Sequence, residues 1–375
     1  MMLVFSLLIA VLICWRGIAP LKIALKWKVA AGIFCSAVAF KFFILLIFSG
    51  KMFFVPPWPT WILLTSTWLY AWMVFFALFL LIYEVIMLII KGIAAIRKKK
   101  LTIAPAWRIS APAISALISL IGMYGGLKIP AVVDYEIKHP DLPAELDGYT
   151  IAHLSDIHAD PFCRREKIEK IVALTNALQT DLIVITGDFV DGKTGQRGKD
   201  LEVLRNLHAG DGVFGVPGNH EYYSGYAEWM NFLRSCGITM LENGHVLIGN
   251  NRITLAGVTD PAAGRMKEEK PDIVKALAGS PEDNFLILLA HQPRLADKAA
   301  DAGVDLQLSG HTHGGMIWGM DQIIALFNKG LVSGTYDIGR MKLHISNGTG
   351  IWNGFPLRLG RPSEIIRLTL RRGTE

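Results

Sequence analysis

Two histidines separated by one residue stand in a glycine-rich segment, Gly310-His311-Thr312-His313-Gly314-Gly315. The segment directly follows the apolar run Val304–Leu308. Histidines at positions i and i+2 of a tight loop can both direct a ring nitrogen at one metal ion, and glycine lets the backbone turn sharply enough for this. A surface loop that carries two histidines by chance is the alternative. The polar residues upstream decide between the two.

Metal-capable side chains also follow four other short apolar runs. The runs are residues 149–154, 182–185, 212–216 and 285–289, and each predicts a buried strand. Sites in α/β sheets form at the carboxyl ends of strands, so we expect the polar residues there to meet. These residues are Asp156 and His158, Asp188 and Asp191, Asn219 and His220, and His291.

The residue types indicate a metal centre. Asp156 and His158 share one face of an extended segment, because alternate side chains point the same way. Carboxylate, amide and imidazole ligands without thiolate suit Mn²⁺, Fe²⁺ or Zn²⁺ rather than a structural zinc site. There are more candidates than one ion can use, which favours a dinuclear site. Five of the ten histidines lie at the strand ends: His158, His220, His291, His311 and His313.

The alternation of strands and helices indicates an α/β fold in the larger part of the chain. Residues 167–178 have helical spacing between the first two strands. Beyond Leu331, alternating runs at residues 342–346 and 364–370 predict antiparallel strands that close the sheet. We expect one domain over residues 129–375.

The same residues form an ordered set that resembles a known family. The set is similar to the five blocks of the calcineurin-like metallophosphoesterases and extends over about residues 130–370. Residues 155–158 together with 310–315 resemble a bacterial subgroup of membrane-associated phosphodiesterases. The resemblance implies a four-layer α-β-β-α sandwich. The blocks are Asp156-x-His158, Gly187-Asp188-x-x-Asp191, Gly218-Asn219-His220-Glu221, His291 and Gly310-His311-x-His313.

The resemblance also implies a role for each residue. A hydroxide that bridges two divalent ions (Mn, Fe or Zn) would attack the phosphorus of a phosphodiester or pyrophosphate. His220 would stabilise or protonate the leaving oxygen, and Asp191 would orient His220. Asp191 as a plain turn residue is the alternative, and Glu221 is expected to be a structural neighbour. The implied ligands are Asp156, His158 and His313 for one metal, Asn219, His291 and His311 for the other, and Asp188 as the bridge.

Two positions depart from the family pattern. Protein phosphatases of the superfamily carry an arginine where this chain has Gly192, so phosphorylated proteins are not the expected substrates. The bacterial subgroup often has a glutamine where this chain has Met316. The segment that follows, residues 316–327, is unusually apolar for a loop beside a metal site. It either packs in the core, or faces the bilayer and admits a lipid tail.

The first third of the chain is apolar and basic. Residues 1–128 contain 13 lysines and arginines and one acidic residue, Glu84, whereas the remainder has 25 basic and 31 acidic residues. The longest apolar run exceeds the roughly 20 residues that cross a bilayer. A signal peptide is the alternative for the first run. We expect a multi-pass cell-membrane region of about four helices over residues 1–128, with runs at 2–15, 29–54, 58–90 and 111–127.

Basic residues cluster in two loops of this region, at residues 16–28 and 91–108. The positive-inside rule assigns both loops to the cytoplasm, so four spans place the domain after residue 128 outside the cytoplasm. If the fourth run does not cross, the domain lies in the cytoplasm instead.

The composition argues against two classes of function, nucleic-acid binding and transport. The acidic remainder offers no basic surface for nucleic acid, and no protein partner is evident. A transporter is disfavoured because the runs contain few charges, namely Lys41, Lys51 and Glu84. We predict a membrane-anchored, metal-dependent phosphoric ester hydrolase whose substrate is a phosphate ester. Lipid-linked pyrophosphates or phosphodiesters and soluble nucleotides or nucleotide second messengers are the competing substrate classes. A non-catalytic membrane sensor or scaffold of the same fold is the alternative. Cys163 and Cys236 can pair or stay free.

Overall fold

The computed structural model describes residues 2–48, 58–97 and 107–373. The chain divides into two compact units, Met1–Tyr124 and Gly125–Glu375. The division falls inside the last helix of the apolar region, α5 (Trp107–Leu127), so the final turn of this helix belongs to the second unit.

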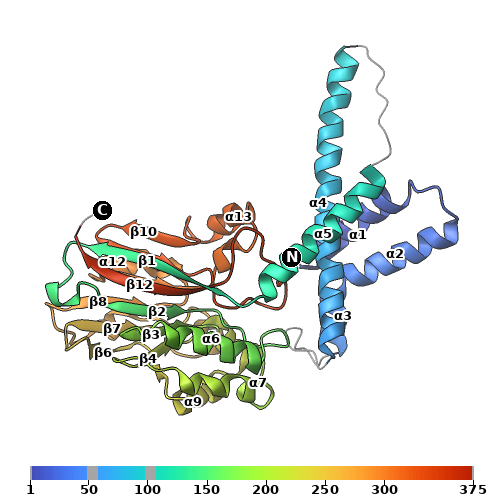
Figure 1. Ribbon diagram of the computed structural model, residues 1–375. Coiled ribbons are helices and arrows are strands. Elements are labelled where there is room, and N and C mark those ends of the chain that lie inside the picture. The colour runs from blue at the N-terminus through green and yellow to red at the C-terminus, as the bar shows by residue number, and fades with distance from the viewer. Residues whose placement is uncertain (1, 49–57, 98–106, 374–375) are drawn as a thin grey trace. The chain divides into compact units, whose positions relative to one another are not determined.

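The described residues of the first unit form helices (Figure 1). Two of them, α4 and residues Ser110–Leu127 of α5, are long and apolar enough to cross a membrane. The helices α2 and α3 would make a third span if the pair, bent by 64°, counts as one. The bounds are α1 (Met2–Leu12), the π-helix η1 (Ile13–Ile18), α2 (Leu25–Ala39), α3 (Lys41–Phe48) and α4 (Thr60–Ile96).

We expected about four spans, whereas the described residues contain two helices long enough to cross, or three spans if the bent pair counts as one. The run predicted at residues 29–54 bends between α2 and α3, and its residues 49–54 lie outside the described residues. The first run forms helix only over residues 2–18, fewer than a bilayer requires. In contrast, α4 has 37 residues and extends about 55 Å, well beyond the hydrocarbon thickness.

Two six-stranded sheets form the centre of the second unit (Figure 1). The first has the order β1-β12-β2-β3-β4-β5, in which β2, β3, β4 and β5 are parallel. The second has the order β10-β11-β9-β8-β7-β6, in which β11, β9, β8 and β7 are parallel. The bounds are β1 (Ala131–His139), β2 (Thr150–Leu154), β3 (Leu182–Thr186), β4 (Val213–Val216), β5 (Thr239–Met240), β6 (Gly244–Ile248), β7 (Ile253–Gly257), β8 (Phe285–Leu289), β9 (Leu306–Ser309), β10 (Gly334–Ile338), β11 (Met341–Ile345) and β12 (Glu364–Arg372).

Four layers result, as the sequence predicts. Apolar side chains from both sheets meet in the central core, and the outer faces are covered by α6, α7 and α9 on the first sheet and by α11 and α12 on the second. The strand β3 is buried along its whole length, which explains its unbroken apolar sequence. The helix bounds are α6 (Arg165–Ala177), α7 (Thr194–Leu201), α8 (Asn219–Ser224), α9 (Tyr226–Ser235), α10 (Ala263–Met266), α11 (Ile273–Leu277), α12 (Ala296–Asp301) and α13 (Met320–Phe327).

Three details differ from the expectations. The strand β11 is antiparallel to β10 but parallel to β9, because the tight hairpin from β10 reverses the chain. The strand β12 is antiparallel to β2 but parallel to β1, a partly exposed edge strand that was not predicted from the sequence. The core alternative for residues 316–327 is wrong, because Trp318 and Leu326 are each 81% exposed. Cys163 and Cys236 are buried and free.

Candidate metal centre

The predicted site residues all lie just beyond the carboxyl ends of five strands. Asp156 and His158 follow β2, and Asp188 and Asp191 follow β3 in the same sheet. Asn219 and His220 begin α8 directly after β4. The second sheet contributes residues from the loops after β8 and β9: His291, His311 and His313.

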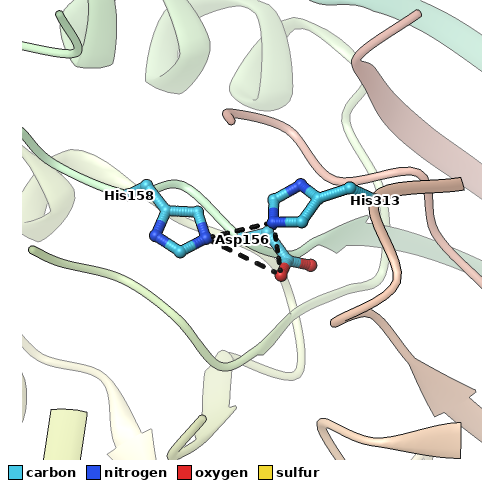
Figure 2. A group of neighbouring side chains, drawn as sticks. All are labelled: Asp156, His158 and His313. Carbon is cyan, nitrogen blue, oxygen red and sulfur yellow. Dashed lines mark hydrogen bonds and ion pairs between the residues drawn. The ribbon is translucent and has the colours of Figure 1, made fainter. Parts of the chain in front are cut away.

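One group of ligand atoms is formed by Asp156, His158 and His313 (Figure 2). The Nε2 atoms of the two histidines are 3.2 Å apart. Asp156 Oδ1 lies 3.5 Å from the His313 nitrogen and 3.9 Å from the His158 nitrogen. Ligand atoms that lie about 2.1 Å from one ion are roughly 3 to 3.5 Å from one another. The three side chains, which come from both sheets, therefore fit a single cation.

A second group surrounds His291 Nε2. This atom lies 3.2 Å from Asp188 Oδ2, 3.2 Å from His311 Nδ1 and 3.2 Å from Asn219 Oδ1. Three potential ligand atoms thus lie at the distance from His291 Nε2 that is expected between ligands of one ion. The donors are nitrogen and oxygen only, which suits the hard or borderline cations predicted from the sequence.

Asp188 lies beside both groups. Its Oδ2 atom is 3.2 Å from His291 Nε2 and 3.7 Å from His158 Nε2. Its other oxygen, Oδ1, accepts a hydrogen bond from the His220 backbone at 2.9 Å, which fixes the carboxylate. A single carboxylate oxygen therefore occupies the place that a bridge between two cations requires.

Hydrogen bonds fix which nitrogen of two histidines faces the centre. His291 Nδ1 is 2.7 Å from the Thr186 carbonyl oxygen, which can only accept, so this nitrogen carries the proton. His158 Nδ1 is 3.1 Å from Asp191 Oδ2 and is held in the same way. In both residues the Nε2 lone pair is left for a metal, the usual arrangement of histidine ligands.

Asp191 also holds His220. Its Oδ1 atom accepts from His220 Nδ1 at 2.5 Å, so one buried carboxylate orients two imidazoles. On the opposite side of the ring, His220 Nε2 lies 3.9 Å from Asp188 Oδ2. Asp191 is therefore more than a turn residue before Gly192.

The backbone is strained where the ligands converge. Twelve non-glycine residues of the described chain have a positive φ, and five of them are predicted ligands. Such conformations cost on the order of 1 kcal/mol or more each and persist only where the surroundings determine them. They redirect the chain after each strand so that side chains from different loops meet. The five are Asp156, His158, Asp188, His311 and His313.

Two glycines of the motifs are required because neighbouring side chains occupy the space that a Cβ atom would need. A Cβ atom on Gly218 would lie 2.2 Å from Asp188 Oδ1, and one on Gly310 would lie 1.8 Å from Ser155 Oγ. Any side chain at either position would displace a predicted ligand or its hydrogen-bond partner.

Comparisons with known proteins agree with this geometry. The family model of calcineurin-like phosphoesterases matches residues 149–315. The chain is 33% identical over 262 residues to an uncharacterized metallophosphoesterase of Aquifex aeolicus, a match that covers 67% of this chain and 97% of that protein. This chain belongs to the calcineurin-like phosphoesterases. The predicted membership of this superfamily of metal-dependent hydrolases is confirmed.

Two further relatives extend the comparison. A Danio rerio protein described as a transmembrane protein with metallophosphoesterase domain is 34% identical over 269 residues, covering 69% of this chain and 61% of that protein. An uncharacterized metallophosphoesterase of Helicobacter pylori is 36% identical over 250 residues, covering 66% of each chain. This phosphoesterase thus spans somewhat less than two thirds of the length of these two relatives.

Neighbouring histidines and aspartates in the phosphoesterase site shift one another's pKa values. Burial alone would lower the pKa of His220, but Asp188 and Asp191 raise it to about 9. The pKa of Asp188 falls well below its usual range despite burial, because His291 and His220 lie beside it. Burial, together with the neighbouring His291, lowers the pKa of His311 to about 4. A neutral imidazole, as at His311, and an ionised carboxylate, as at Asp188, are the states in which these groups bind cations.

Some residues that support the site were missed or undervalued from the sequence. Glu221 is fully buried, and its carboxylate accepts hydrogen bonds from the backbone of Asp188, Phe189 and Gly218 at 2.7 to 3.0 Å. Ser155 Oγ donates to Asp156 Oδ2 at 2.6 Å, a partner that its place before Asp156 could have suggested. Arg358 donates to the His313 carbonyl oxygen at 3.1 Å, and no sequence signal marked it.

Proposed function

We propose that this chain is a membrane-anchored hydrolase of phosphoric esters that works with two divalent metal ions. The observation that carries the proposal is the single Asp188 oxygen placed between two groups of converging ligand atoms. Bound there, the ions would lower the pKa of water and offset the charge on the phosphoryl oxygens. The residues that would hold them are Asp156, His158 and His313, then Asn219, His291 and His311, with Asp188 shared.

His220 is the proposed proton donor to the leaving oxygen. Its Nδ1 atom is engaged by Asp191, so proton transfer would take place at Nε2, on the side of Asp188. Asp188 and Asp191 raise the pKa of His220 to about 9, which is the direction that a general acid requires. Asp191 acts through His220 and is a positioning residue.

The proposed substrate is a phosphodiester or pyrophosphate, with a lipid-linked phosphate as the favoured class. Gly192 stands where protein phosphatases of this superfamily carry an arginine, which argues against phosphorylated proteins. The two helices able to cross a membrane would keep the site at a bilayer, where amphiphilic phosphates are concentrated.

The test is hydrolysis of bis-p-nitrophenyl phosphate by the full chain in detergent, stripped of metal and reloaded with Mn²⁺, Fe²⁺ or Zn²⁺. We expect metal-dependent turnover that is abolished in Asp188→Asn and lowered in His220→Ala. The matched control is His208→Ala, an exposed histidine whose Nδ1 atom lies 3.2 Å from the nearby backbone oxygen of Asn206. Turnover that persists in Asp188→Asn would refute the proposed site.

The rival function is a non-catalytic metal sensor with the same fold. It predicts two bound ions without hydrolysis of any diester, pyrophosphate or monoester. The His220–Asp191 pair favours the enzyme, because a sensor has no use for a buried proton donor beside its metal ligands. Bound metal without turnover of any of these substrate classes would favour the sensor.

We also propose a multi-pass topology with the phosphoesterase unit outside the cytoplasm. The support is the basic segment between α4 and α5, together with the length of α5, which is sufficient for one crossing. Labelling of Val274→Cys in intact cells with a membrane-impermeant maleimide tests this orientation, since Val274 is 78% exposed. Labelling only after lysis would place the unit in the cytoplasm.

A further inference from the structure

The helix α13 exposes an apolar face beside the candidate metal centre. Ile323, Leu326 and Phe327 are 54%, 81% and 67% exposed and lie at the i, i+3, i+4 spacing of one helix face. Trp318, just before the helix, adds a fourth large exposed side chain. The opposite side of the helix is anchored, because Asp321 is buried and binds Arg361 at 2.6 Å. A cluster of large apolar side chains on a surface marks an interaction site.

This apolar face is joined closely to the metal-site loop. Only four residues separate His313 from Trp318. The backbone of residues 316–318 pairs with Leu359, through Trp318 N to Leu359 O at 2.8 Å and Leu359 N to Met316 O at 3.0 Å. The segment before α13 is therefore held on the loop at residues 356–359.

The same loop receives the last turn of α5. A Cβ atom on Gly125 would lie 2.5 Å from the Arg358 carbonyl oxygen, and one on Gly126 would lie 2.4 Å from that of Pro356. These contacts lie within the second unit, which begins at Gly125. Leu359 is three residues from Pro356, at most roughly 11 Å of chain. The segment before α13 is thus close to the point where a helix able to cross the membrane ends.

Cationic side chains stand at the end of α13. Arg294 Nη2 donates to the Phe327 carbonyl oxygen at 3.2 Å, and Lys329 is exposed two residues after Phe327. Lys329 also pairs with Asp297 at 2.5 Å. Apolar and aromatic side chains bordered by Arg and Lys match the acyl boundary and the phosphates of a lipid headgroup layer.

We propose that Trp318 and α13 form a second membrane contact, inserted in the headgroup region of the bilayer that α5 crosses. Such a contact would hold the His311–His313 loop at the lipid surface, where the phosphates of amphiphilic substrates lie. The inference rests on the membrane anchoring in the proposed function. It does not depend on hydrolysis, so the two can fail separately.

The test uses the full chain in nanodiscs of phosphatidylcholine and phosphatidylglycerol, one protein copy per disc. Leu326→Cys and Ile323→Cys carry a nitroxide label, and the label background of the unsubstituted chain is subtracted. The matched control is Val274→Cys, because Val274 is an equally exposed apolar residue on α11 of the same unit. Collision rates are measured with oxygen, which concentrates in lipid, and with a water-soluble nickel chelate.

We expect at least a threefold higher ratio of oxygen to nickel collision rates at residues 326 and 323 than at residue 274. Equal ratios at all three positions would overturn the proposal, since α13 would then face water. Labels at 326 and 323 shielded from both reagents would also overturn it, because the helix would then be covered by protein. Neither result would bear on turnover of bis-p-nitrophenyl phosphate, which tests the proposed function.

Discussion

Two groups of buried histidines in the second unit differ in their surroundings, and only one of them has the chemistry of a site. His153 on β2 and His344 on β11 lie between the sheets with their ring centroids 6.4 Å apart. Their hydrogen-bond partners are hydroxyl groups, Thr186 Oγ1 at 2.8 Å and Thr335 Oγ1 at 2.9 Å. Burial, with the neighbouring His344, lowers the pKa of His153 to about 3, and burial lowers that of His344 to about 4.

The site histidines are as deeply buried but lie beside carboxylates. His158, for example, is within 3.1 to 3.9 Å of three aspartates, and its pKa is raised although burial alone would lower it. His153 is only five residues from His158, yet it lies inside β2 whereas His158 lies beyond the strand end. Burial is therefore common to both regions, and the loops that bring carboxylates to the strand ends make the difference.

The largest expected effect is a loss of bound metal and turnover that occurs at the site histidines and not at those between the sheets. His291→Ala removes the nitrogen around which the second ligand group is arranged, so we expect loss of one bound ion and at least about a thousandfold loss of turnover. His344→Gln in the inter-sheet region is the matched control and should keep both ions. The measurement is metal content by mass spectrometry together with hydrolysis of bis-p-nitrophenyl phosphate. Equal metal loss in both variants would show that folding, not ligation, is affected.

The next effect distinguishes a proton donor from a ligand within the site. His220→Gln should lower turnover about 10²- to 10⁴-fold while both ions stay bound, because His220 donates a proton and does not hold metal. The loss should be greater for a methyl ester than for a p-nitrophenyl ester, whose leaving oxygen needs little protonation. His208→Gln, an exposed histidine, should leave turnover unchanged. An equal loss for both esters would contradict the role of general acid.

Acid should destabilise the inter-sheet region through the same histidines. Their folded-state pKa values of about 3 and 4 lie below the unfolded value of about 6.5, so between these limits the unfolded chain binds more protons. Stability is present above pH 6.5 and is lost as the pH falls toward 4, by up to about 1.4 kcal/mol per pH unit for each histidine. The double variant His153→Gln/His344→Gln should lose less stability between pH 6.5 and 5 in denaturant unfolding of the metal-loaded chain. Parallel curves for both chains would remove these histidines from the acid response.

The strand ends could be predicted from the sequence because unbroken apolar runs are typical of strands buried on both faces. The runs before Asp188 and His291 are of this kind, and they correspond to β3 and β8. The edge strand β1 has no unbroken apolar run, because from Val133 to His139 the more buried side chains alternate with exposed charged ones. This alternation is the signal of a half-buried strand and could have identified β1. Whether β11 pairs parallel or antiparallel depends on the hairpin before it, which local sequence does not report.

The metal ligands could be predicted from the sequence, but most of the residues that hold those ligands in place could not. Metal-capable residues are few and stand in order, so their types and positions suffice to propose them. Arg358 is different, since it contacts His313 from a segment 45 residues further along the chain, a proximity that only the tertiary fold creates. Asp191 could be placed beside His220, but its second partner, His158, became visible only with the loops in place.

The smallest expected effect concerns Glu221, which supports the site through the backbone. Its two oxygens accept three backbone N–H groups, and the amide of Glu221→Gln would leave at least one of them without an acceptor. We expect the free energy of unfolding of Glu221→Gln to be about 1 to 3 kcal/mol lower, and amide hydrogen exchange to be faster at residues 188–189. Glu228→Gln, on an exposed carboxylate, is the control. Burial and the neighbouring Asp188 raise the pKa of Glu221 to about 7, so the effect should be larger at pH 8, where the carboxylate is ionised, than at pH 6. An effect independent of pH would mean that shape, not charge, lets Glu221 hold the loop that carries Asp188.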